Sequence, residues 1–141
     1  MAGTRRPEQV ASMSFSLSKK EIMKEIVKCG KHPDYFINTY AKITPPQRGL
    51  IPFHLYRFQE KLLEDFEDYR FNVILKARQL GISTITAAYV AWMMLFHREK
   101  NVLVIATKFS TAANLVKKVK AIINMYLSGN LREILNFYKL K

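Results

Sequence analysis

Apolar residues before position 41 recur at helical spacing and predict two helices. Ser18 and Glu21 have the spacing of a capping box, in which the two residues satisfy each other's backbone N–H groups at a helix start. Gly30 predicts a left-handed end to this first helix. A second, short helix is predicted from Pro33 to Tyr40, with aromatic residues on its apolar side.

From residue 52 onward the pattern alternates between helix and strand. Steps of three and four residues from Leu55 predict an amphipathic helix of about fourteen residues. A short apolar run and a continuous one predict two parallel strands, and the stretch between them has no polar face, which predicts a buried helix. In chain order these segments are Phe71 to Leu75, Ile85 to Phe96, and Asn101 to Thr107. Together they predict one βαβ unit.

Two more helices are predicted after this unit, from Ser110 to Leu127 and from Leu131 to about Tyr138. A parallel sheet needs cover on both faces and normally has four or more strands, whereas this sequence supplies two. We therefore expect the chain to be the front part of a larger domain. Apolar surface should be exposed where further strands belong.

The segment between the first predicted strand and the buried helix carries the main chemical signal. It reads Lys76, Ala77, Arg78, Gln79, Leu80, Gly81, Ile82, Ser83 and Thr84. A loop that leads from a strand into a helix directs backbone N–H groups and the positive end of the helix dipole at one point, which suits a phosphate. Against the pattern G-x-x-x-x-G-K-[ST], Gly81 and Ser83 match, but Lys76 replaces the first glycine and Ile82 the lysine.

Each residue type in this loop has a role in binding Mg²⁺ and ATP. Lys76 can reach the β- and γ-phosphates from the start of the loop. Ser83 or Thr84 would offer a hydroxyl to magnesium, with Ser83 better placed, and Gly81 would let the backbone approach the phosphates. Arg78 could stabilise charge on the transferred phosphoryl group as an arginine finger. The alternative is a basic strand-to-helix turn that binds nothing.

Gln59 lies about twenty residues before the loop, within an aromatic-rich stretch that begins at Phe53. A glutamine amide offers a donor and an acceptor that match the edge of adenine, and an aromatic ring can stack on the base. The alternative is that Gln59 belongs only to the start of the amphipathic helix.

The charge favours a polyanionic partner. Twenty-three Lys and Arg residues against eleven Asp and Glu give a formal net charge of +12. Three lysines lie largely on the polar side of the predicted helix after residue 110: Lys117, Lys118 and Lys120. The single cysteine, Cys29, excludes an internal disulfide and, without Cys/His clusters, a zinc site is not expected. The longest apolar run is too short to span a membrane, so we expect a soluble, cytoplasmic protein.

Three elements in order resemble the N-terminal ATPase region of the large terminase subunits of tailed bacteriophages, the motors that package viral DNA. They are Arg78-Gln79-Leu80-Gly81-x-Ser83-Thr84 with the displaced Lys76, Leu55-Tyr56-x-Phe58-Gln59, and Tyr35-Phe36-Ile37-x-x-Tyr40. The resemblance extends from about residue 32 to about residue 125. It is more specific than the loop alone.

The resemblance implies a role for each matching residue. Gln59 would belong to the adenine-recognising element, and residues 76 to 84 would form a deviant phosphate loop with Arg78 as the trigger of hydrolysis. Lys108, within Thr107-Lys108-Phe109-Ser110, would lie in a motif for coupling or DNA contact. The intact protein would bind double-stranded DNA, the phage portal and the small terminase subunit. It would form a homo-oligomeric ring in the cytoplasm of the infected bacterial host.

Taken together, the expected fold class is α/β. Residues 1–16 would be a flexible tail, residues 17–50 a small helical N-terminal subdomain, and residues 51–141 an incomplete P-loop NTPase with a parallel βαβ core. The boundary is placed at the proline-containing stretch 44–49, because proline and glycine interrupt helices.

Two family features are absent from this sequence: the strand with the Asp-Glu pair that holds magnesium and activates water, and the nuclease domain. The parent protein is expected to be an ATPase, whereas we expect this chain not to hydrolyse ATP at a useful rate. Two alternatives remain open. One is a basic nucleic-acid-binding module without nucleotide chemistry, and the other is a fragment of a helicase-like translocase.

Overall fold

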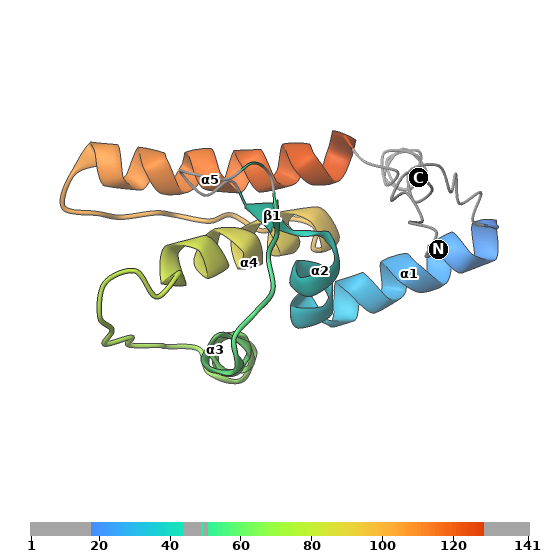
Figure 1. Cartoon of the computed structure of the whole chain (residues 1–141), viewed down its shortest axis with the longest axis horizontal. Helices are drawn as coiled ribbons and strands as arrows, with labels where there is room; N and C mark the ends of the chain where they lie inside the picture. Colours follow the sequence, from blue (N-terminus) through green and yellow to red (C-terminus); the bar gives the residue numbers. More distant parts are fainter. Residues whose placement is uncertain (1–17, 44–48, 50, 129–141) are drawn as a thin grey trace, which may run out of the picture.

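The computed structural model describes residues 18–43, 49 and 51–128. The elements in order are α1 (Lys19–Lys31), α2 (Pro33–Tyr40), β1 (Lys42–Ile43), β2 (Ile51–Pro52), α3 (Arg57–Asp68), α4 (Ile82–Phe96) and α5 (Phe109–Ser128). Figure 1 shows α4 between α5 above and α3 below, with α1 leading away to one side. The predicted tail and the predicted last helix lie outside the described residues.

Helix α4 is the centre of the buried core. Ile85, Ala87, Ala88 and Ala91 are fully buried, and the three alanines allow neighbouring helices to approach closely. The prediction of a buried helix is confirmed, although the helix begins three residues earlier than expected. Its neighbours in the described residues are other helices, whereas the sequence predicted a sheet on one side.

Helix α1 begins as predicted but ends differently. The Ser18 hydroxyl accepts a hydrogen bond from the Glu21 N–H at 3.4 Å, and the Glu21 carboxylate accepts one from the Ser18 N–H at 2.8 Å, which confirms the capping box. The prediction of a left-handed end at Gly30 is wrong, because the helix continues to Lys31 and Gly30 does not have a positive φ. Gly30 instead lies against the Phe96 ring at the end of α4.

Hydrogen bonds join the two N-terminal helices to each other and to α4. One oxygen of the Glu25 carboxylate accepts from the hydroxyls of Tyr35 and Tyr40 at 2.8 and 2.7 Å. The Trp92 indole N–H donates to the Cys29 carbonyl at 2.7 Å. Burial, followed by the hydrogen bond to Glu25, raises the pKa of the Tyr40 hydroxyl far above its ordinary value. The Tyr40 phenol is therefore a neutral donor to the carboxylate at neutral pH.

A single cluster of buried residues draws on both sides of the predicted subdomain boundary. Phe36 and Ile37 of α2 belong to the same cluster as Ile85 of α4 and Tyr126 of α5. The ring centroids of Phe36 and Tyr126 are 4.9 Å apart in an edge-to-face arrangement. The N-terminal helices and the later helices thus share one core.

The two predicted parallel strands are not paired in the part of the chain that the structure describes. Residues 71–75 and 101–107 form neither a helix nor a strand, so neither stretch belongs to a sheet. Val73 and Leu75 are completely exposed, and Leu103 and Ile105 are exposed by 83% and 84%. Figure 1 shows the stretches at different levels, one leading from α3 to α4 and the other from α4 to α5. Without a neighbouring strand, their backbone N–H and C=O groups cannot form the hydrogen bonds of a sheet.

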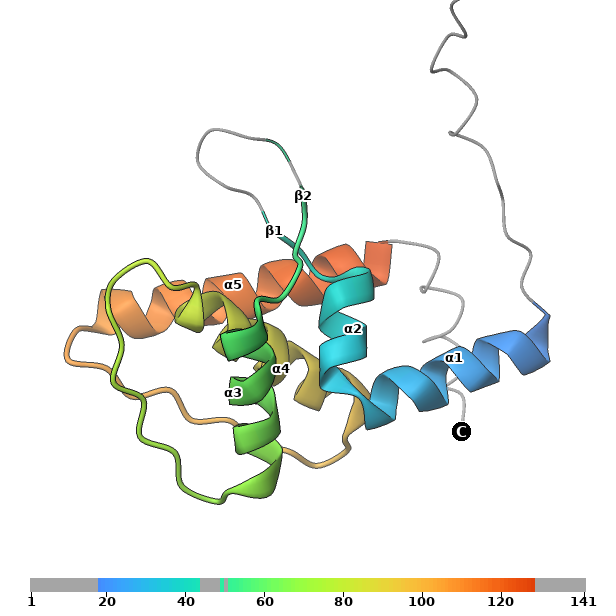
Figure 2. The same cartoon turned by 60° about the horizontal axis from the view of Figure 1, so that its bottom comes forward.

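The sheet that does occur within the described residues is a short antiparallel pair that the sequence analysis missed. Strand β1 pairs with β2 in the register Lys42↔Pro52 and Ile43↔Ile51, beside α2 (Figure 2). Two residues per strand are too few to show an alternating pattern in the sequence. A parallel βαβ core is not seen among the described residues, so the P-loop fold class stays a prediction.

We predict that replacing Trp92 with Phe lowers the free energy of unfolding by about 1–3 kcal/mol, because the buried Cys29 carbonyl loses its donor. Urea unfolding of both proteins measures the difference. Tyr69→Phe is the control, because Tyr69 is 62% exposed and its substitution should change stability by less than about 0.5 kcal/mol. Equal effects of the two substitutions would contradict the role of the Trp92 bond.

We also predict that the thiol of Cys29 is unreactive in the folded protein. Burial, with a smaller contribution from the Glu25 carboxylate, raises its pKa from 9.0 to about 12. Since the unfolded chain releases this proton more readily, the contribution to stability is present below pH 9 and is lost as the pH rises from 9 to 12. Labelling with a thiol reagent at pH 8 should be slow and should become fast in denaturant. Fast labelling without denaturant would contradict the buried position.

Candidate functional site

The predicted phosphate loop forms an exposed turn that leads into α4. Residues 76–80 are exposed, and two residues adopt the left-handed conformation, Gln79 with φ of 63° and Gly81 with φ of 72°. Gly81 is the N-cap of α4. Left-handed residues in a turn can orient successive backbone N–H groups toward one anion. The structure therefore agrees with the predicted loop-to-helix geometry, although the stretch before the loop is not paired as a strand.

Gln59 contacts this loop directly. Its side chain is 1% exposed, and its amide nitrogen donates to the Leu80 carbonyl at 3.0 Å. The amide oxygen accepts from the Tyr56 N–H at 3.0 Å, at the start of α3. One amide thus links the beginning of α3 to the loop. Only one N–H proton and one oxygen lone pair of Gln59 are left for any further partner.

Gly81 is constrained in two ways. A Cβ atom built on Gly81 would lie 2.9 Å from the Gln59 amide nitrogen, closer than side chains tolerate. Its left-handed φ is also unfavourable for any residue with a Cβ. The fold itself therefore requires glycine at this position, the second glycine of the loop pattern, whether or not a ligand binds.

The start of α4 presents free backbone donors. The N–H groups of Thr84 and Ile85 both donate to the Gly81 carbonyl, at 2.9 and 3.0 Å. The N–H groups of Ile82 and Ser83 are the first two of the helix and have no acceptor within it. No side chain caps α4, in contrast to α1. Helix α4 is 15 residues long, and its positive end favours an anion at this position.

The cationic residues and hydroxyls of the loop are accessible to solvent. Lys76, Arg78 and Ser83 are exposed, and Thr84 is half-buried. In the part of the chain that is described, neither Lys76 nor Arg78 forms a salt bridge. Their charges are therefore available to an external anion.

An exposed pair of aromatic rings precedes Gln59. Tyr56 and Phe58 are 68% and 47% exposed, with ring centroids 5.9 Å apart and planes inclined by only 6°. The aromatic character of this stretch is evident from the sequence, whereas the pairing of the rings is not. The pairing follows from side-chain directions at the helix start, which apolar periodicity does not encode.

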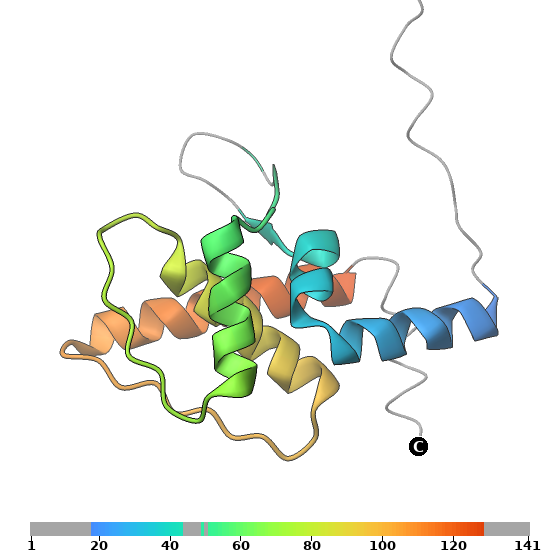
Figure 3. The ribbon, with the colours of Figure 1, turned by 90° about the horizontal axis from the view of Figure 1, so that it is seen from below.

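The basic residues predicted to contact DNA lie on the solvent side of α5 or just before it. Lys117, Lys118 and Lys120 are exposed, while Val119 and Ile122 are buried on the opposite side. Lys108 precedes α5, and its carbonyl accepts from the Thr111 N–H at 3.0 Å. Figure 3 shows α5 running behind α4, with the loop before α4 toward the same side of the molecule as the start of α5.

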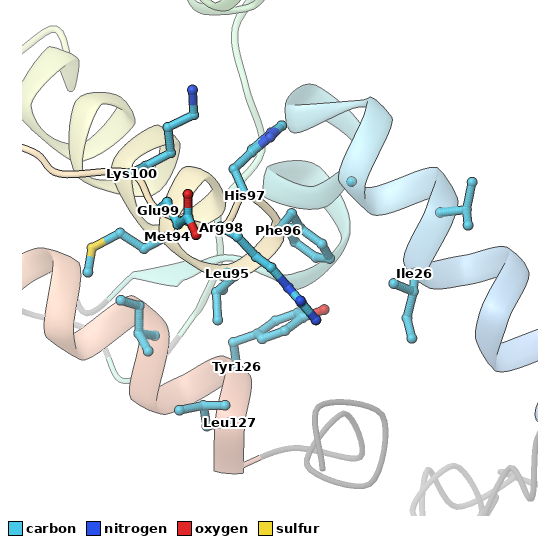
Figure 4. A pocket seen from close by; sticks show the side chains of 13 residues that line it. Ile26, Met94, Leu95, Phe96, His97, Arg98, Glu99, Lys100, Tyr126 and Leu127 are labelled. Atoms are coloured by element: carbon cyan, nitrogen blue, oxygen red, sulfur yellow. The ribbon is translucent and has the colours of Figure 1, made fainter. Parts of the chain in front are cut away.

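A cavity of about 620 Å³ lies elsewhere, among α1, the end of α4 and the end of α5 (Figure 4). Its lining is mostly apolar, with Arg98, Glu99 and Lys100 on the turn after α4. None of the predicted nucleotide-site residues lines it. The described residues hold no group of three or more His, Cys, Asp or Glu side chains placed to bind a metal. Among the helices described, none is long and apolar enough to cross a membrane.

No protein-family model matches the sequence.

Proposed function

We propose that residues 76–84 bind the phosphates of ATP, as part of the N-terminal ATPase region of a viral DNA-packaging motor. The observation that carries the proposal is the link from Gln59 to the loop. An amide from α3 donates to the Leu80 carbonyl immediately before the uncapped start of α4. A residue proposed for adenine recognition and a loop proposed for phosphate binding are thereby neighbours, although they are 21 residues apart in sequence.

The proposed binding chemistry divides between backbone and side chains. The N–H groups of Ile82 and Ser83, at the positive end of α4, would donate to phosphate oxygens. Lys76 would neutralise the β- and γ-phosphates, and Arg78, with its planar set of donors, would stabilise charge on the transferred group. The remaining loop residues would contribute through their backbone groups and through the conformation of the loop.

Magnesium would be held mainly by the nucleotide. The Ser83 hydroxyl would supply one oxygen ligand, since it is exposed at the start of α4. Mg²⁺ commonly keeps several waters and binds through substrate phosphates, so one protein hydroxyl fits this donor set. The described residues offer no metal-binding cluster that would compete for the ion.

We predict that Lys76→Ala weakens the binding of Mg²⁺-ATP by roughly 10- to 100-fold, because hydrogen bonds to charged groups contribute about 1.5–3 kcal/mol. Calorimetric titration of the wild-type chain and the variant measures this change. Lys61→Ala is the matched control, since Lys61 is exposed on α3 and pairs with Asp65. Equal affinity in all three proteins, or no binding to the folded wild-type chain, would refute the nucleotide site.

We predict that Gly81→Ala impairs both stability and ATP binding. The added methyl group would collide with the Gln59 amide, and the left-handed backbone would be strained. Thermal unfolding should show destabilisation of about 1–3 kcal/mol. Gly49→Ala is the control, because nothing lies within 4 Å of a Cβ at Gly49. Unchanged stability and ATP affinity in Gly81→Ala would show that the loop has a different conformation from the one described.

A second function, nucleic-acid binding without nucleotide chemistry, is favoured by the exposed lysines of α5. We predict that replacing Lys117, Lys118 and Lys120 together with Gln lowers the slope of log K against log salt for duplex DNA by about three, because each lysine neutralises about one phosphate. Fluorescence anisotropy at several salt concentrations measures the slope. DNA binding without any ATP-dependent change in thermal stability would favour this function over the first.

A further inference from the structure

Helix α1 carries lysines along a single face. They are Lys20, Lys24, Lys28 and Lys31. At about 100° per residue these four positions fall within an arc of about 80°, and they span about 16 Å of the helix axis. We call this set the α1 lysine stripe. All four side chains are exposed.

The acidic residues of α1 do not neutralise the stripe. Glu21 accepts a hydrogen bond from the Ser18 N–H as part of the helix cap. Glu25 accepts from the hydroxyls of Tyr35 and Tyr40 on the side facing α2. Lys24 contributes to lowering the pKa of Glu21, after the hydrogen bonds to Ser18, but the stripe forms no salt bridge within the described residues.

The remainder of α1 fixes the stripe in place. Ile26 and Cys29 are buried in the shared core, and the Cys29 carbonyl accepts from Trp92. The Lys28 ammonium lies 3.6 Å from the centre of the Tyr35 ring, a cation–π contact. Figures 1, 2 and 3 all show α1 projecting beyond the other described elements. The C-terminal half of α1 is therefore anchored in the core, and the lysine face can be approached from outside.

The charge and exposure of the α1 lysine stripe indicate which class of partner fits it. An anionic bilayer would attract the charge, but interfacial helices also insert an apolar face into the lipid. In α1, Ile26 and Cys29 are buried in the core, and the exposed large apolar side chains are Met23 and Val27, which are too few to form a broad apolar face. A polyanion that needs only surface contact is therefore the better fit. At one phosphate per about 3.4 Å, each strand of a duplex presents four or five phosphates over the length of the stripe.

We propose that the α1 lysine stripe is a binding surface for the phosphate backbone of nucleic acid, separate from α5 and from the nucleotide loop. Contacts of this kind read no base and give affinity without sequence preference. The proposal does not depend on ATP binding.

The test measures DNA binding in the absence of nucleotide. One variant of the full chain carries Lys20→Gln, Lys24→Gln and Lys31→Gln, and Lys28 is retained because of its contact with Tyr35. The charge-matched control carries Lys42→Gln, Lys61→Gln and Arg70→Gln, all exposed positions outside α1 and α5. Binding of a labelled mixed-sequence duplex is followed by anisotropy over a salt series. Circular dichroism checks that helix content is retained, as expected because Gln and Lys have similar helix propensities.

The expected result is a salt slope lower by about three in the α1 variant and nearly unchanged in the control. Equal losses in both variants would mean that only net charge matters and would overturn the proposal. So would the absence of DNA binding by the wild-type chain. An α1 variant that keeps its DNA affinity but no longer binds phosphatidylserine vesicles would overturn it in favour of a membrane surface.

Discussion

The hydrogen bond from the Gln59 side chain to the Leu80 carbonyl is the constraint on which the candidate site depends. The loop before α4 is otherwise exposed and belongs to no sheet within the described residues, so its position depends on the end that joins α4. There α4 is packed in the core, and a buried amide of α3 bonds to Leu80, immediately before Gly81. Breaking this hydrogen bond without moving α3 would leave a buried amide unsatisfied, at a cost of about 1–3 kcal/mol. The absence of a Cβ at Gly81 allows the approach.

The helices could be predicted from the sequence because their signals are local. The capping box at Ser18, the apolar spacing through α3 and the unbroken apolar content of α4 each involve residues less than one helix apart. Strands depend on partners that may be anywhere in the chain, and an apolar run such as Phe71 to Leu75 does not say what it pairs with. The unpaired stretches where strands were predicted, and the short β1–β2 pair that was missed, both follow from this difference.

The candidate site shows the same division between local and distant information. The loop-to-helix geometry with Gly81 at its end was readable from residue types. The involvement of Gln59 was expected as well, but for adenine recognition, whereas the structure shows its amide bonded to Tyr56 and Leu80. That arrangement could not be predicted from the sequence. Tyr56 is only three residues from Gln59, but Leu80 is 21 residues away and is brought close by the fold. Adenine recognition by Gln59 would have to use its remaining proton and lone pair while the tether is kept.

The distribution of charge over the surface, more than the total charge, indicates where a polyanion would bind. A net charge of +12 would describe an evenly basic surface equally well. In the structure the two glutamates of α1 are hydrogen-bonded to Ser18, Tyr35 and Tyr40, and the lysines form no salt bridge with them within the described residues. Lys24 helps to lower the pKa of Glu21, but the lysines outnumber the two carboxylates, so the outer face of α1 keeps a net positive charge. Helix α5 has no acidic residue, and its buried side holds the apolar residues while its outer side holds three lysines. The way the helices pack in the core therefore also decides where a polyanion would meet an excess of positive charge.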